Sequence, residues 1–158
     1  MTDGLGRSTA DRIWLVTPFD RAVRAEVHRL FADGVEQVDA TAVSRSGGWD
    51  RRQVETSIES LEAEHRLALL PDTHRVWMAH PFSGIDTGYR AHINGRSWFA
   101  NCAWDALAIV ALLGDGTGRA TGRNGLVDWH IEGGLVSPNG LVHLLVPAAR
   151  FWNDIGFT

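Results

Sequence analysis

The stretch Tyr89–Leu113, YRAHINGRSWFANCAWDALAIVALL, contains a predicted β-hairpin followed directly by a helix. Asn94-Gly95 is typical of a two-residue hairpin turn, so we predict strands at Tyr89–Ile93 and Ser97–Phe99. The segment Asn101–Leu113 is almost entirely apolar and ends before a glycine, which indicates a buried helix of about three turns. This hairpin and helix decide the fold of the second half of the chain.

Upstream of this unit, capping residues and apolar periodicity predict three helices. Arg21–Phe31 has apolar residues at helical spacing and is followed by Asp33-Gly34, a helix end. Asp39 is suited to cap a short second helix, which Gly47-Gly48 would stop. Asp50 is suited to cap a third helix with an apolar face and a charged outer face.

Two short apolar runs, residues 67–70 and 75–79, flank a turn and predict a further hairpin. Three helices followed by a hairpin is the arrangement of a winged helix-turn-helix unit. We therefore predict an α+β protein with a flexible tail at 1–11, a winged-helix-like domain at 12–80 and a small α+β domain at 81–158.

Four further segments complete the predicted second domain. The segment 115–124 is rich in Gly, Thr and Arg, so we predict a loop there. Residues 127–131 and 140–146 have strand-like patterns, and residues 151–154 suggest a last helical turn. The run 114–118 resembles a phosphate-binding loop, but no Lys-Ser/Thr follows it. We therefore expect no bound cofactor.

Charge and composition limit the classes of function. The formal net charge of −4 argues against a polyanion such as nucleic acid as the main partner. Five arginines between residues 45 and 75 leave a local basic face open. No apolar run approaches the ~20 residues that cross a bilayer, and residues 1–11 show no secretory signal, so we expect a cytoplasmic protein. The one cysteine excludes an internal disulfide and an all-thiolate metal cage within one chain.

That cysteine, Cys102, lies three residues before Asp105 in the predicted apolar helix, so the two side chains share a face. A place in the first helical turn favours a thiolate, whereas an ionised Asp105 raises the pKa of the thiol. Such a coupled pair suits a site that binds a soft metal and also delivers a proton. The spacing alone leaves open an inert core cysteine.

The motifs around this pair resemble the alkylmercury lyase family. Pro81-Phe82-Ser83, Asn94-Gly95-Arg96 and Ala100–Gly114 follow the family's order of a strand, a Gly-Arg turn and a Cys-x-x-Asp helix. Near the end, Val146–Ala149 and Phe151–Ile155 are similar to the stretch that leads to the family's second reactive cysteine. The family also has a winged-helix-like N-terminal region that does not read DNA.

The resemblance implies protonolysis of a carbon–mercury bond in a small organomercurial or other thiophilic compound. Cys102 would be the first thiol that holds mercury and Asp105 the proton shuttle, so both would contact the metal of the substrate. The family's second cysteine is expected just beyond Thr158, and the family's C-terminal end is missing from this sequence. We therefore expect weak cleavage, or capture without cleavage.

Two alternative functions stay open at this point. One is a winged-helix transcriptional regulator that senses a thiophilic metal through Cys102, and the other is a family pocket with unrelated chemistry. The predicted recognition helix and its end carry four carboxylates that would repel DNA: Glu55, Glu59, Glu62 and Glu64.

Aromatic and histidine residues supply further candidates. Trp98 and Trp104 flank Cys102 and could wall an apolar pocket, although ordinary packing explains them equally well. His92 and His130 lie on predicted strands and could face a shared pocket, with surface or core positions as the simpler interpretation.

Overall fold

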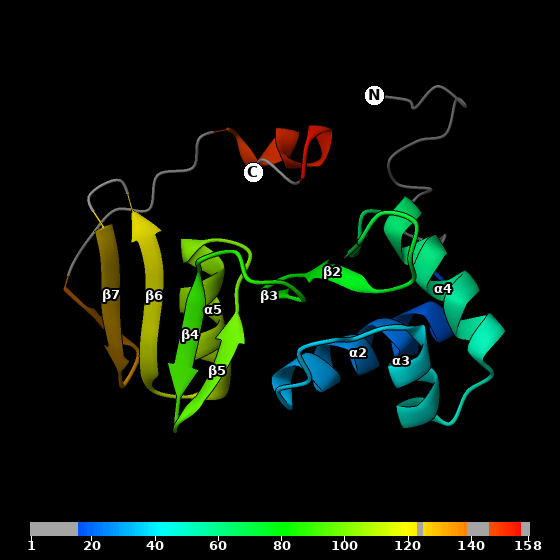
Figure 1. The fold of residues 1–158 in the computed structure, drawn as a ribbon, viewed down its shortest axis with the longest axis horizontal. Helices are drawn as coiled ribbons and strands as arrows, with labels where there is room; N and C mark the ends of the chain where they lie inside the picture. Colours follow the sequence, from blue (N-terminus) through cyan, green and yellow to red (C-terminus); the bar gives the residue numbers. More distant parts are fainter. Residues whose placement is uncertain (1–15, 123–124, 139–145, 156–158) are drawn as a thin grey trace.

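The computed structural model describes residues 16–122, 125–138 and 146–155, and it is a mixed α and β structure (Figure 1). Within these residues the chain forms four α-helices, two antiparallel sheets and a final 3₁₀ helix. In Figure 1, α2, α3 and α4 gather at one end of the molecule and the larger sheet with α5 lies at the other. Strands β2 and β3 lie between the two groups.

The three N-terminal helices are α2 (Pro18–Ala32), α3 (Ala40–Gly47) and α4 (Arg51–Ala63). The predicted N-caps are confirmed, because the Asp39 carboxylate accepts from the Ala42 N–H at 2.7 Å and the Asp50 carboxylate from the Gln53 N–H at 3.1 Å. Helix α2 begins earlier than predicted. Its first turn is a reciprocal capping box, in which the N-cap residue Thr17 and the buried Asp20 exchange hydrogen bonds.

The smaller sheet has the order β1-β2-β3, with β1 at Ala68–Leu69, β2 at Val76–Ala79 and β3 at Phe82–Ser83. The hairpin predicted for residues 67–79 is confirmed by the antiparallel pairing of β1 and β2. Strand β3 pairs with β2, and Phe82 also forms a bridge with Ala100. One hydrophobic cluster includes core residues from before and after Pro81, so the two predicted domains are packed together.

The larger sheet has the order β5-β4-β6-β7-β8. Its strands are β4 (Arg90–Ile93), β5 (Arg96–Phe99), β6 (Gly116–Gly122), β7 (Gly125–Glu132) and β8 (Leu135–Ser137), and α5 (Ala103–Leu113) packs against β4 and β6. The predicted β4–β5 hairpin is confirmed. Asn94 and Gly95 have φ values of 49° and 77°, the left-handed pair that a two-residue primed turn requires.

The prediction of a loop at residues 115–124 is wrong, because most of this segment is β6. Strand β6 is a central strand that pairs with β4 on one side and β7 on the other. Gly116 allows close backbone approach rather than a turn, because a Cβ there would lie 2.2 Å from the carbonyl oxygen of His92. Pairing with strands distant in sequence thus overrides the low strand propensity of glycine.

We expect Gly116→Ala to destabilise the fold by about 3 kcal/mol, at the upper end of typical overpacking effects, because the clash is with backbone that cannot rotate away. Gly118→Ala, in the same strand, is the matched control. Its added Cβ would make ordinary contacts of 3.5 to 3.8 Å with Trp129, Leu107 and Ala106, so it should leave stability nearly unchanged. Urea unfolding of both variants checks this, and equal stabilities would contradict the close approach of β6 to β4.

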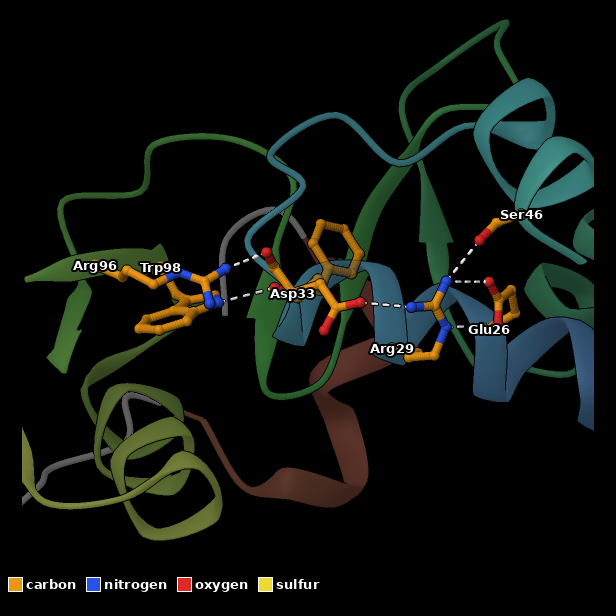
Figure 2. A network of polar contacts seen from close by, with 7 residues as sticks. Glu26, Arg29, Asp33, Ser46, Arg96 and Trp98 are labelled. Atoms are coloured by element: carbon orange, nitrogen blue, oxygen red, sulfur yellow. Dashed lines mark hydrogen bonds and ion pairs between the residues drawn. The ribbon is translucent and has the colours of Figure 1, made fainter. Parts of the chain in front are cut away.

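The junction between α2 and the β4–β5 hairpin is polar at its rim and aromatic inside (Figure 2). The buried Trp98 indole N–H donates to the Phe31 carbonyl at 2.8 Å, and the Arg96 guanidinium donates to the Asp33 carbonyl. On the same helix Arg29 pairs with Glu26 and Asp33, as Figure 2 shows. The bonds from Trp98 and Arg96 reach carbonyls at the end of α2, and the Phe31 carbonyl also accepts from the Gly34 N–H at 2.8 Å.

The last described element is the 3₁₀ helix η1 (Ala148–Asn153), close to the helical turn predicted at residues 151–154. The ring of Trp152 stacks on His65 at the end of α4, with ring centroids 4.4 Å apart. The predicted strand at 140–146 lies mostly outside the described residues. None of the described helices combines the length and apolarity needed to span a bilayer.

Candidate functional site

Cys102 is the N-cap residue of α5, with extended backbone angles of φ −151° and ψ 179°. It therefore lies one residue before the first helical turn in which we predicted it. The thiol is partly buried, and its side chain makes no capping hydrogen bond. The position still places the sulfur beside the unpaired N–H groups that begin α5, where negative charge is favoured.

Asp105 is the third residue of α5 and is buried, with 9% of its surface exposed. Two side chains contact one of its oxygens, Oδ2: the His80 Nδ1 atom at 3.1 Å and the Asn101 Nδ2 atom at 3.0 Å. Asn101 also donates to the Phe82 carbonyl at 3.1 Å. Asp105 is a carboxylate in an otherwise apolar helix. Its polar partners lower the free-energy cost of burying it.

His80 and Asn101 were not among the residues singled out from the sequence. His80 directly precedes the Pro81-Phe82-Ser83 motif and Asn101 directly precedes Cys102, and this adjacency was the available signal. Their meeting depends on the pairing of β2 with β3 and on the bridge between Phe82 and Ala100, which link segments about 20 residues apart.

The surroundings of Cys102 raise the pKa of its thiol above the ordinary value. Burial is the largest cause, and the negative charge of Asp105 acts in the same direction. The backbone N–H groups of Asp105 and Trp104 oppose this by stabilising the thiolate. The direction predicted for the effect of Asp105 is therefore confirmed, and the favourable helix end does not outweigh burial.

We expect alkylation of Cys102 by iodoacetamide to be slower at neutral pH than alkylation of free cysteine. A raised pKa leaves a smaller fraction of reactive thiolate, and the rate should keep rising above about pH 8.5, the usual pKa of a thiol. Because the chain has one cysteine, the mass gain reports this residue alone. A rate that already levels off below that pH would contradict the pKa direction.

The tryptophan candidates lie in different surroundings. Trp98 is buried in the junction with α2 and lines a small cavity together with Phe31, Phe82 and Arg90. That cavity does not include Cys102. Trp104, by contrast, is 63% exposed at the start of α5, beside Cys102 in the chain. Of the two, only Trp104 adjoins the thiol through its position in the helix.

The histidine candidates share a row of the larger sheet. The register pairs His92 with Thr117 and Thr117 with His130 across β4, β6 and β7. Gly118 faces α5, so its neighbour Thr117 and the two histidines point to the opposite face of the sheet. This face is separate from Cys102 and Asp105. Among the described residues, no group of three or more His, Cys, Asp or Glu side chains could hold a metal ion.

The site lies in a segment that matches a known family. The alkylmercury lyase family model (MerB) matches residues 82–122, from β3 through α5 to β6. The matched residues include Cys102 and Asp105, so the family recognised from the sequence is confirmed on this segment. No curated protein matches the chain in sequence.

The fold is similar to that of a protein solved with mercury. The crystal structure of the mercury-bound form of MerB2 superposes with a TM-score of 0.63 at 18% sequence identity, covering 80% of this chain. This likeness shows a shared fold. The chain spans 63% of the length of that protein.

Proposed function

We propose that this chain captures small organomercurials at Cys102 and transfers a proton through Asp105 to the carbon that leaves mercury. One observation carries the proposal: a thiol and a buried carboxyl lie three residues apart at the start of α5, inside the alkylmercury lyase segment. A soft thiolate matches a soft metal, and a buried carboxyl beside it can hold the proton that the thiol gives up.

The chemistry can be written in two balanced steps. In the first, the Cys102 sulfur forms a bond to mercury, the anionic ligand of the organomercurial leaves, and the thiol proton passes to Asp105. In the second, Asp105 gives that proton to the carbon, the carbon–mercury bond breaks and the hydrocarbon departs. Mercury(II) then stays on the Cys102 sulfur beside the Asp105 carboxylate.

A single thiol limits the second step. These 158 residues contain one cysteine, so they offer mercury no second thiolate, and an added small-molecule thiol can supply one. Without it, the bond between mercury and carbon is weakened less and the mercury product stays on Cys102. We therefore expect capture to be strong and turnover to be weak.

We infer that the predicted domain at residues 12–80, which the structure describes from residue 16 on, is a winged-helix-like unit that supports the site rather than reading DNA. Support comes from contacts between this region and the rest of the chain: the Trp98 indole N–H donates to the Phe31 carbonyl, and the Arg96 guanidinium donates to the Asp33 carbonyl. On α4, Arg51 is paired with Glu55, which reduces its availability for phosphate. Binding to random duplex DNA at low salt would instead favour the regulator alternative.

Incubation with methylmercury and excess small-molecule thiol tests the proposal. We expect one methylmercury retained per chain before thiol is added, followed by slow release of methane and inorganic mercury above the rate of a protein-free control. Retention without methane above that control would contradict the proposed cleavage step and would support capture alone. Absence of retention would overturn the proposal as a whole.

A further inference from the structure

We infer that His80 is a positioning residue that fixes the Asp105 carboxylate, by donating a hydrogen bond from Nδ1 to Oδ2. This role within catalysis rests on the proposed function, whereas the hydrogen bond itself does not. His80 lies between β2 and β3, outside the helix that carries Cys102 and Asp105. Its ring reaches Asp105 at 3.1 Å.

The direction of this bond follows from counting hydrogens. The Asn101 amide has two N–H hydrogens, and its nitrogen lies 3.1 Å from the Phe82 carbonyl oxygen and 3.0 Å from Asp105 Oδ2. Both hydrogens are thereby used, so the 3.3 Å separation between Asn101 Nδ2 and His80 Nδ1 is not a third donated bond. An ionised carboxylate only accepts, so His80 Nδ1 has to carry the hydrogen that bonds Asp105.

The orientation of the amide is supported by its surroundings. Reversing Asn101 would place its oxygen against two acceptor oxygens, those of Phe82 and Asp105. In the observed orientation the Asn101 Oδ1 atom is buried without a hydrogen-bond partner among the described residues. The unpaired oxygen costs free energy, but this orientation keeps both N–H hydrogens of Asn101 on acceptor oxygens.

As a consequence, the two oxygens of the Asp105 carboxylate differ in their hydrogen bonds. Oδ2 accepts from both His80 and Asn101, which fixes the rotation of the carboxyl group. Oδ1 is then the oxygen that can exchange a proton with the substrate. Positioned acids and bases act only when the proton lies within hydrogen-bond reach of the reacting atom, so loss of this orientation slows proton transfer without affecting the thiol.

His80 is held in turn from the N-terminal helices. The His28 ring on α2 contacts the His80 backbone carbonyl through Nε2 at 3.2 Å and the Arg24 carbonyl through Nδ1 at 2.7 Å. The side chain of His80 is 46% exposed, so its replacement should leave the hydrophobic core intact. We therefore expect variants at His80 to fold, and thermal melting by circular dichroism is the measurement that checks this.

Three substitutions separate the hydrogen bond from the bulk of the ring. His80→Asn places an amide nitrogen near the position of Nδ1, His80→Gln places it near Nε2, and His80→Ala has no donor. We expect methylmercury capture to be unchanged in all three. Cleavage of the captured compound should fall about tenfold in the Ala and Gln variants and stay within about threefold of wild type in the Asn variant, as expected for one hydrogen bond to a charged group.

A measurement without mercury tests the hydrogen bond by itself. In long-range ¹H–¹⁵N spectra, taken at a pH where the ring is neutral, His80 should show the Nδ1–H form. Asp105→Ala should shift it towards the Nε2–H form. The inference would be overturned by a His80 ring in the Nε2–H form in the wild type. It would also be overturned if the tautomer of His80 were the same in wild type and Asp105→Ala. Equal cleavage by the wild-type and Ala variants would do the same.

The proposed function and the proposed role of His80 can be disproved independently of each other. If wild-type protein captures methylmercury and releases no methane, the cleavage step fails while the spectra still decide whether His80 positions Asp105. If cleavage occurs and all three variants match wild type, the proposed function stands and the role of His80 is wrong.

Discussion

Cys102→Ser is expected to abolish the stoichiometric retention of organomercurial by this chain. A hydroxyl is a hard, weakly acidic ligand that cannot replace a soft thiolate on mercury, and no other cysteine is present among the 158 residues. Retained methylmercury should fall from one per chain to the level of a protein without thiols. Mercury analysis after gel filtration gives the measurement.

Unfolding cannot account for this loss. Cys102 is an N-cap without a side-chain capping bond, and serine is among the preferred N-cap residues because its hydroxyl accepts from the N–H of the first turn. The variant should therefore be as stable as wild type, or more stable by up to about 1 kcal/mol. Unchanged retention in a folded Cys102→Ser protein would show that mercury binds elsewhere and would contradict the proposed role of Cys102.

Asp105→Asn is expected to spare capture and remove cleavage. The amide has nearly the shape of the carboxyl, and its oxygen in the place of Oδ2 can accept from both His80 and Asn101, but it holds no transferable proton. Loss of a positioned acid typically slows proton transfer by about 10²–10⁴-fold. Methane release from captured methylmercury should fall by at least the lower figure, with retained mercury unchanged.

Asp128→Asn is the matched control for removing a carboxylate. Asp128 lies on β7 and forms a two-bond pair with Arg119 on the face of the larger sheet opposite α5. This pair lowers the pKa of Asp128, so its loss tests general electrostatics and stability rather than the site. Equal loss of capture and cleavage in Asp105→Asn would contradict the role of proton shuttle and would indicate a structural one.

The parts of the fold predicted from sequence are those with local signals. Asn94-Gly95 specified a turn whose backbone geometry few other residues adopt, and Asp39 and Asp50 marked helix starts through bonds made within one turn. Strand β6 was missed because its glycines indicate a loop locally. The need for glycine at position 116 is visible only when β4 lies alongside, where a Cβ would meet the His92 carbonyl.

The residues of the candidate site also differ in whether a local sequence pattern predicts them. Cys102 and Asp105 are three residues apart at the start of a single apolar helix, so spacing and the family resemblance together predicted them as candidates. His80 and Asn101 reach Asp105 through strand pairing and a bridge that no local pattern predicts. The exact helix start was also beyond local signals, which placed Cys102 one residue too far into α5.

The most direct test of the central claim is the mass of the intact protein after exposure to methylmercury, followed with time after addition of excess thiol in deuterated water. We expect one methylmercury adduct on wild-type protein, which then loses its methyl group as singly deuterated methane. The adduct should form on Asp105→Asn and keep its methyl group, and it should be absent from Cys102→Ser. An adduct that persists equally in wild type and Asp105→Asn, with no deuterated methane above the thiol control, would contradict the claim.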